Sequence, residues 1–373
     1  MNAWARRGRA VSLPPRTRAA RSHVQSPDVT KTEARVRTTT TWPARAGARV
    51  LLALLAALIG AATARVGDAQ AQERPAGKVY RIGFLSQGQP PKVYMEALRQ
   101  GLRERGYVEG RNLVWEMRST DGSLDQLSQF ADDLVRLKVD VILARASSGA
   151  TAAKKATSSI PIVFFAVYAP VEVGLVPSLG HPGGNITGTA VNASDMAGKR
   201  VQLLKELVPT LKRVAMLSHP PHPTNAVQLR GAEAAARAIG VQLEAVPVRT
   251  GADLGPALKA LRGVDAVLNA DTPLFVTNRA RLVGAVAESR LPAIYPARVY
   301  VEAGGLASYG PNVPELWKGA AVYVDKILKG ARPGDLPVEQ PTTFELTINN
   351  RTAGAIGLTI PQPVVLRADR IVE

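Results

Sequence analysis

From residue 78 onwards, short apolar runs alternate with amphipathic segments. The apolar runs have the length of β-strands and occupy residues 79–86, 113–119, 139–144 and 160–167. After the first run, Met95, Leu98 and Leu102 fall on one face of a predicted helix that Gly106 would end. Such alternation predicts a parallel sheet with helices on both faces, and we assign residues 78–188 to a first α/β lobe.

Two more helices complete this lobe. Ser123 and Gln126 have the spacing of a capping box, which predicts a helix that begins at Ser123 and buries Leu124, Leu127, Ala131 and Leu134. The Ala- and Ser-rich segment 147–159 predicts the second helix.

The pattern then starts again, which predicts a second lobe over residues 189–310. Its expected strands are residues 213–219, 241–248, 265–271 and 291–297. Its expected helices are residues 193–209, 225–239, 253–261 and 274–289. The chain as a whole is therefore predicted to be an α/β protein with two doubly wound parallel-sheet lobes.

The remaining residues are expected to run between the lobes. A helix that buries Leu316, Ala320 and Ile327 ends at Gly330, and we assign residues 311–335 to the first lobe. The Pro-rich tail from residue 336 looks extended, and we assign residues 340–373 to the second lobe as its return crossover.

A leader precedes the first lobe. Residues 1–44 form a basic extension without apolar periodicity, and Arg45 and Arg49 precede the apolar run 50–64. This run is shorter than a spanning helix needs, and small residues at cleavage spacing follow it, ending at Ala64 or Ala71. We therefore expect a signal peptide within residues 1–71 and a periplasmic product.

The absence of cysteine from all 373 residues narrows this expectation. A lipoprotein requires a cysteine at its processing site, so we expect a soluble protein that is not a lipoprotein. Stability would then come from large cores rather than from disulfides.

The net charge of +17 raises the question of nucleic-acid binding. Residues 1–71 hold 12 Lys or Arg and three Asp or Glu, so more than half of the excess lies in the leader. Elsewhere basic residues mix with acidic ones on predicted helix faces, which is typical of a solvated surface. We expect no nucleic-acid partner.

Motifs for catalysis, nucleotides and metals are missing. The sequence has no G-x-G-x-x-G after the first strand, no P-loop and no G-x-S-x-G. His219 and His222 are separated by two prolines and lack nearby Cys or acidic partners, so a metal site is not expected. We predict that the protein is not an enzyme and needs no cofactor.

Polar residues and tyrosines follow the predicted strands, where parallel α/β sheets bind ligands. In the first lobe these candidates are Ser86, Gln87, Ser147, Ser148, Tyr168 and Ala169. In the second lobe they are His219, Asp271, Thr272, Tyr295, Ser308 and Tyr309. Ser147 and Ser148 open a helix and suit a carboxylate, Asp271 suits an ammonium group, and the tyrosines offer ring faces.

The segment 178–188, SLGHPGGNITG, lies where the first lobe ends. It lacks the Lys and Ser/Thr of a phosphate loop, and a strand rather than a helix follows it. Because glycine permits unusual backbone angles, we expect Gly183 and Gly184 to form the first crossover and a hinge, with Gly310 as a further hinge position.

Long segments resemble a known family. They are YMEALRQGLRERGYVEGRN, IPIVFFAVYAPVEVGLVPSLGHPGGNITG, LPAIYPARVYVEAGGLASYGP and the C-terminal run from AAVYVDKILKG to VVLRAD. Over residues 78–373 the chain is similar to the periplasmic substrate-binding proteins of ABC importers of the tryptophan/tyrosine type. The resemblance implies a type I periplasmic-binding fold with three crossovers, and delivery of a small ligand to an inner-membrane permease driven by a cytoplasmic ATPase.

The chain departs from this family in two loops. It has Ala169-Pro170-Val171 where the family usually has Asp-Pro-Val, which removes an acidic partner for an ammonium group. It has His219-Pro-Pro-His222-Pro where the family often has Asn-Pro-x-Asn-Pro. The ligand is therefore expected to be amino-acid-like or a small carboxylate.

Three alternatives remain at this point. The receptor could present its ligand to a sensor or chemoreceptor instead of a permease. The same fold serves lactose-repressor-type regulators, although residues 1–50 have no helix-turn-helix pattern. An α/β enzyme is the third alternative. In each receptor case we expect a monomer whose lobes close on the ligand.

Overall fold

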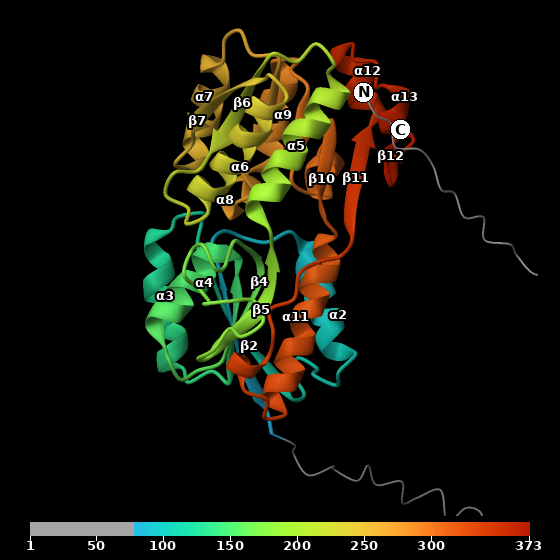
Figure 1. The fold of residues 1–373 in the computed structure, drawn as a ribbon. Helices are drawn as coiled ribbons and strands as arrows, with labels where there is room; N and C mark the ends of the chain where they lie inside the picture. The colour runs from blue at the N-terminus through green and yellow to red at the C-terminus, as the bar shows by residue number, and fades with distance from the viewer. Residues whose placement is uncertain (1–77) are drawn as a thin grey trace, which may run out of the picture. The chain divides into compact units, whose positions relative to one another are not determined.

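The computed structural model describes residues 78–373, which form two β-sheets with helices packed against them (Figure 1). The expected signal peptide and basic extension lie outside the described residues. Among residues 78–373, no helix combines the length and apolar character needed to cross a membrane.

The first sheet is parallel and has the strand order β2-β1-β3-β4-β5. Its strands are β1 (Tyr80–Ser86), β2 (Leu113–Ser119), β3 (Val141–Arg145), β4 (Ile162–Tyr168) and β5 (Ile186–Val191). β3 is buried along its whole length and β1 from its third residue, as expected for strands covered on both faces. Because strand order reverses beside β1, the carboxyl ends of β1 and β3 form the edge where a ligand site is expected.

Helices cover both faces of this sheet. They are α2 (Lys92–Arg103), α3 (Asp125–Arg136), α4 (Ala146–Ala156) and α11 (Val313–Leu328). Side chains of α2 and α11 share one core with Ile82 and Phe84 of β1, while side chains of α3 and α4 share another with Leu85. Alternate side chains of β1 therefore pack into two different cores, one on each face of the sheet.

The predicted capping box at Ser123 is wrong. Helix α3 begins one residue later than a Ser123 cap requires, with Leu124 at its N-cap and no side-chain cap. The Ser123 hydroxyl accepts instead from the Asp125 amide at 3.2 Å, because a serine hydroxyl readily bonds a backbone group two residues on.

The second sheet has the order β12-β11-β10-β9-β8-β6-β7. Its strands are β6 (Arg213–Ser218), β7 (Gln242–Pro247), β8 (Ala266–Asn269), β9 (Ala293–Tyr295), β10 (Ala307–Pro311), β11 (Phe344–Asn349) and β12 (Arg370–Val372). It is parallel except that β11 pairs antiparallel with β10, because β11 enters from the returning tail.

The helices of the second lobe follow the predicted alternation. They are α5 (Ala193–Leu207), α6 (Asn225–Ala238), α7 (Leu254–Ala260), α8 (Pro273–Thr277), α9 (Arg279–Glu288), α10 (Arg298–Glu302), α12 (Asn350–Ile356) and α13 (Gln362–Val365). The single helix expected over 274–289 is wrong. Asn278 (φ −96°, ψ 17°) separates α8 from α9, and its amide donates to the Leu274 carbonyl at 2.9 Å.

The chain passes between the sheets after β5, after β10 and before β11. The expectation that Gly183 and Gly184 form the first crossover is wrong, because β5 continues the first sheet through the pair Tyr168–Val191 and the chain leaves only at Asn192. Gly183 donates instead to the carbonyl of Gly334, at 3.2 Å.

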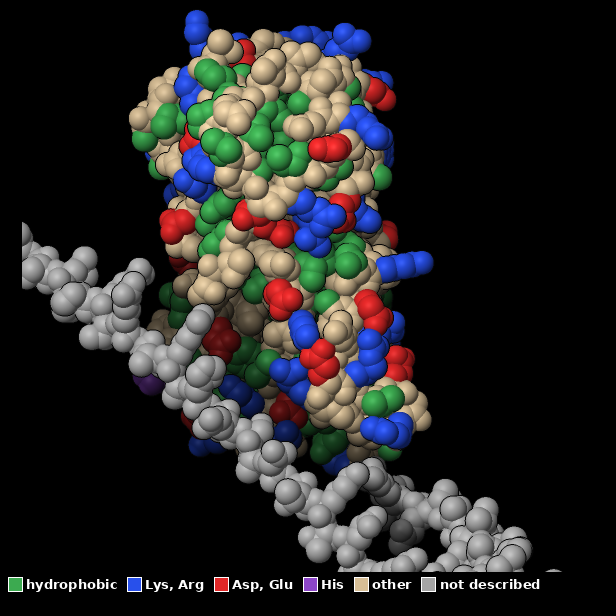
Figure 2. Space-filling view, turned by 90° about the vertical axis from the view of Figure 1, so that its right-hand side faces the viewer, with side chains coloured by type: hydrophobic (Ala, Val, Ile, Leu, Met, Phe, Trp, Pro, Cys, Tyr) green, Lys and Arg blue, Asp and Glu red, His purple; other side chains and the backbone are tan. Residues whose placement is uncertain are grey.

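The described surface carries charges of both signs. Figure 2 shows blue and red side chains interspersed over one face of residues 78–373, without a large area of one colour. Many charged side chains of the described residues form ion pairs, as in Lys318–Glu104 at 2.9 Å. The face of residues 78–373 seen in Figure 2 shows no basic stripe of the kind typical of nucleic-acid binding.

Candidate functional site

A narrow cavity of about 40 Å³ lies between the two lobes. The first lobe lines it with side chains from α2, β4, α11 and the end of β3. The second lobe lines it from the loops that follow β6, β8 and β9, from α8 and from the end of β10. Its polar or aromatic lining residues are Tyr94, Arg145, Tyr168, His222, Asp271, Thr272 and Trp317. Three of the predicted ligand residues, Tyr168, Asp271 and Thr272, therefore come together here.

Asp271 is the centre of a contact between the lobes. The hydroxyl of Tyr168, the last residue of β4, donates to Asp271 Oδ2. Arg200 of α5 approaches the same oxygen with Nη2 at 3.7 Å, and its Nε donates to the Tyr309 carbonyl at 2.9 Å. Burial and the Asp271 charge raise the pKa of Tyr168, so its hydroxyl stays protonated and donates. The carboxylate is thus held by one group from each lobe.

Arg145, the last residue of β3, is a second buried guanidinium with only 5% of its surface exposed. Its Nη1 donates to Ser86 Oγ at 3.2 Å and to the Gln87 carbonyl at 3.4 Å. Its guanidinium carbon lies 5.7 Å from the centroid of the Trp317 ring. Burial lowers the pKa of Arg145 to about 10, so the group remains charged at neutral pH.

The polar candidates near the start of α4 serve the first lobe itself. Ser147 Oγ donates to the Tyr168 carbonyl at 2.9 Å and accepts from the Tyr168 amide at 3.2 Å. Ser148 Oγ donates to Gln87 Oε1 at 3.1 Å, and Gln87 Nε2 donates to the Gly122 carbonyl at 2.7 Å. Ser86 accepts from Arg145, as described above. These side chains position the strand ends rather than line the cavity.

The remaining candidates also lie outside the cavity lining. Tyr295 is buried and its ring stacks on that of Tyr300, with centroids 5.1 Å apart. Tyr309 stacks on Phe344 at 6.2 Å. Ser308 is buried, and its hydroxyl has no hydrogen-bond partner within residues 78–373. Ala169 has a left-handed backbone with φ 52°.

His219 and His222 belong to different hollows. His222 lines the cavity, whereas His219 lines a neighbouring hollow of about 340 Å³ together with Asp121 and Arg249. Both side chains are almost fully buried. Burial lowers the pKa of His219 to about 4 and that of His222 to about 3. Both rings are therefore neutral at pH 7.

We expect these two histidines to make folding pH-dependent. Their folded pKa values lie below the unfolded value of about 6.5, so the unfolded chain binds more protons below that pH. The free energy of unfolding should fall by up to about 1.4 kcal/mol per pH unit for each histidine, or about 2–3 kcal/mol between pH 7.5 and 5.5. Urea denaturation at each pH measures this loss.

A pair of single variants controls for other titrating groups. His222→Gln should flatten the pH slope, whereas His181→Gln should leave it unchanged because His181 is exposed. A slope that is the same in both variants would show that the loss of stability arises elsewhere.

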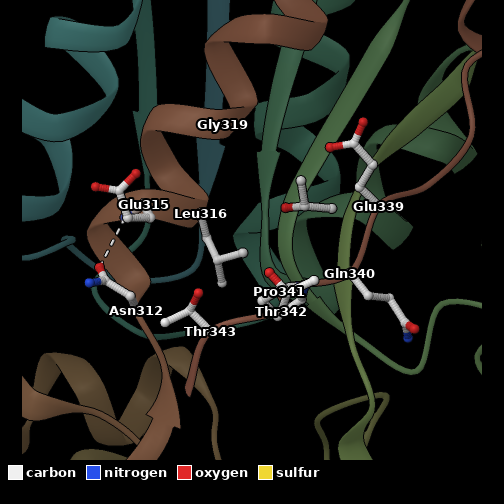
Figure 3. A pocket seen from close by; sticks show the side chains of 10 residues that line it. Asn312, Glu315, Leu316, Gly319, Glu339, Gln340, Pro341, Thr342 and Thr343 are labelled. Carbon is white, nitrogen blue, oxygen red and sulfur yellow. Dashed lines mark hydrogen bonds between the residues drawn. The ribbon is translucent and has the colours of Figure 1, made fainter. Parts of the chain in front are cut away.

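A further pocket, of about 310 Å³, lies beside the crossovers (Figure 3). Its lining comes from Thr189 of β5, from the start of α11 and from the tail 339–343. Glu315 and Glu339 lie on opposite sides of it, and Asn312 Oδ1 accepts from the Glu315 amide at 3.2 Å. These segments lie next to the points where the chain passes from one sheet to the other.

Glycine is required at position 310 for a reason other than the predicted hinge. It lies within β10 opposite Glu345, and a Cβ there would come within 2.0 Å of the Pro296 carbonyl oxygen. Close backbone approach therefore requires glycine at this position. A hinge role for Gly310 stays a prediction.

Four charged or aromatic residues at the site were not among the candidates predicted from the sequence. Arg145 could have been noticed as a charge that directly ends an apolar strand. Tyr94, Arg200 and Trp317 gave no such signal, because each sits on an amphipathic helix whose approach to the cavity depends on the fold. Among the described residues, no group of three or more His, Cys, Asp or Glu could hold a metal ion.

Comparison with known proteins yields a consistent set of relatives. A tyrosine-binding protein of Clostridioides difficile (strain R20291) is 28% identical over 294 residues, which are 79% of this chain and 81% of that protein. A solved structure from Streptococcus pneumoniae, an ABC domain in complex with L-Trp, is 26% identical with a TM-score of 0.74, and the match covers 79% of this chain and 100% of that one.

A conserved domain protein from Vibrio cholerae O1 biovar El Tor strain N16961 has the same TM-score of 0.74 and 29% identity, again over 79% of this chain and 100% of that one. These structures confirm the periplasmic-binding fold with two α/β lobes. The sequence model described as "ABC transporter substrate binding protein" matches residues 91–372. The chain therefore belongs to the ABC transporter substrate-binding proteins, a family of binding proteins rather than enzymes, as the sequence predicted.

Proposed function

We propose that the protein is a periplasmic receptor that closes its two lobes on a small amino-acid-like or carboxylate ligand and delivers it to an ABC permease. The observation that supports this proposal best is the contact of Tyr168 with Asp271, which joins the two lobes beside the cavity. A receptor needs such contacts, because a ligand can drive closure only through interactions that differ between the open and closed states.

The composition of the cavity supports the same proposal. A few buried polar groups stand among aromatic and aliphatic walls, which is typical of small-molecule sites. The relatives point toward amino acids, since one is named for binding tyrosine and another was solved with L-Trp. Export through the N-terminal leader is part of the proposal. We also propose that four polar side chains hold the cavity wall in place rather than bind the ligand: Ser86, Gln87, Ser147 and Ser148.

Thermal-shift screening of the purified chain tests the proposal. Amino acids and small carboxylates are the compounds to screen, and calorimetry then measures Kd for each hit. We expect at least one class to raise Tm, since a ligand at 100 times its Kd adds about 2.7 kcal/mol to the free energy of unfolding.

The variant Tyr168→Phe locates the binding. It removes only the hydroxyl that contacts Asp271. Because the closed form loses this contact between the lobes, the binding free energy of the hit should weaken by about 0.5–1.5 kcal/mol. Tyr80→Phe serves as the matched control, because Tyr80 is the first residue of β1, at the end of the strand away from the cavity, and packs against Tyr107. If no compound raises Tm, or if both variants bind like the parent protein, binding in this cavity is contradicted.

A further inference from the structure

We propose that the ligand is an anion with an apolar body, such as a monocarboxylate without an amino group, and that its charge pairs with Arg145. This inference rests on the proposed function and narrows it. It begins from a buried charge in the wall of the cavity.

The Arg145 charge has no contacting counter-charge among the described residues, although the Asp271 carboxylate stabilises it without touching it. Its hydrogen-bond acceptors, Ser86 Oγ and the Gln87 carbonyl, are neutral, and residues 78–373 provide it with no ion pair. Only Nη1 has acceptors, so Nε and Nη2 remain as donors in a residue that lines the cavity. Burying a charge is costly unless it is paired. An anionic ligand would supply the missing partner in bidentate geometry.

The other charges at the cavity do not change this balance. Arg200, which is buried, and Asp271, which is half-buried, form one pair of opposite sign. His222 is neutral at pH 7, as shown above. Arg145 therefore leaves the cavity with one excess positive charge, and closure on a net-negative ligand would neutralise it.

His222, which lines the same cavity, has a ring donor without a partner among the described residues. Its Nδ1 lies 2.9 Å from Thr224 Oγ1 and accepts from the Thr224 amide at 3.3 Å. Thr224 Oγ1 itself accepts from Gln228 Nε2, so its own proton is available for Nδ1. The proton of the neutral ring is then on Nε2, which is buried and has no hydrogen-bond partner. A ligand oxygen would satisfy it.

An ammonium group would have to share a carboxylate that is already paired. Among the described residues, Asp271 is the only carboxylate that lines the cavity, and Tyr168 and Arg200 already contact its Oδ2. Position 169 is alanine. The rings of Tyr94 and Trp317, with Val276 and Leu316, complete a wall that suits an aromatic or aliphatic body.

Two matched series of compounds test the inference by calorimetry on the full chain. The aromatic series is indole-3-propionate, L-tryptophan and tryptamine. The aliphatic series is 4-methylvalerate, L-leucine and isopentylamine. Within each series the body is similar and the charge differs, so we expect the acid to bind at least tenfold more tightly than the zwitterion, and the amine not to bind.

Three variants assign the preference to Arg145. Arg145→Gln should weaken the acid at least tenfold, and Arg145→Lys should keep the preference at lower affinity because Lys retains the charge without the fork. Lys155→Gln removes one exposed positive charge from the neighbouring α4 and should bind like the parent chain. If Arg145→Gln does not fold, the ranking within each series on the parent chain still decides.

Each outcome separates the two proposals. A zwitterion or amine that binds more tightly than its acid, or an acid whose Kd is the same in Arg145→Gln, overturns the anion inference and leaves the receptor function standing. If only compounds outside the two series bind, an anionic hit supports the inference and a neutral or cationic hit overturns it. Failure of every compound in the thermal-shift screen overturns the receptor function and this inference with it.

Discussion

Replacing Asp271 with alanine is expected to lower the free energy of unfolding by about 3–5 kcal/mol. Arg200 has only 1% of its side chain exposed, and Asp271 is its only ion-pair partner among the described residues. Its Nε donates to the Tyr309 carbonyl, but its Nη2 has no hydrogen bond among the described residues, so Asp271 is the only group that compensates the charge at that nitrogen. Removing Asp271 leaves a buried charge without a partner, and also deprives the Tyr168 hydroxyl of its acceptor. Urea denaturation at pH 7 measures the loss.

Two controls separate the buried pair from a general effect of charge. Asp132→Ala removes an exposed carboxylate of α3 and should change stability by no more than about 0.5 kcal/mol. The double variant Arg200→Met with Asp271→Ala removes both charges and should recover much of the loss, since a buried pair replaced by apolar groups is often neutral. If Asp271→Ala behaves like Asp132→Ala, Arg200 does not depend on this carboxylate.

The arrangement of elements could be predicted from the sequence because each element carries its own local pattern. The helix expected over 193–209 is observed as Ala193–Leu207, and the strand over 113–119 as Leu113–Ser119. The pairing of strands that are far apart in the sequence leaves no such local pattern. Residues 186–191 are a strand in either lobe, and only their register with β4 places them in the first sheet. The first crossover was therefore predicted too early.

The site could be predicted only in part for a similar reason. The rule that ligands bind at strand carboxyl ends led to Tyr168, Asp271 and Thr272, and all three line the cavity; their contact with a ligand stays a prediction. The rule could not predict which hydroxyls form hydrogen bonds within the first lobe and are therefore not free for a ligand. Ser147 bonds the backbone of Tyr168, a strand neighbour that is remote in sequence, and Ser148 bonds Gln87. Trp317 reaches the cavity because α11 returns to the first sheet after the whole second lobe has been formed.

Replacing Trp317 with alanine is expected to lower the free energy of unfolding by about 3–5 kcal/mol. The ring is fully buried, and its centroid lies 4.8 Å from that of Phe165, 5.6 Å from that of Tyr94 and 6.0 Å from that of Phe84. These rings come from α2, β1 and β4, so the tryptophan joins α11 to the rest of the first lobe. Alanine would leave a cavity where the four rings meet, and Arg145 would lose its ring contact.

Comparison with two other substitutions assigns the loss to this aromatic cluster. Trp317→Phe keeps a ring against Phe165 and should lose less stability than alanine. Trp115→Ala makes the same truncation at a half-buried position on β2, where less surface leaves water on folding, so its loss should also be smaller. Equal losses for Trp317→Ala and Trp115→Ala in urea denaturation would contradict the central place of Trp317. Because the same ring also lines the cavity, Trp317→Ala should weaken the bound ligand as well, whereas Trp115→Ala should leave its Kd unchanged.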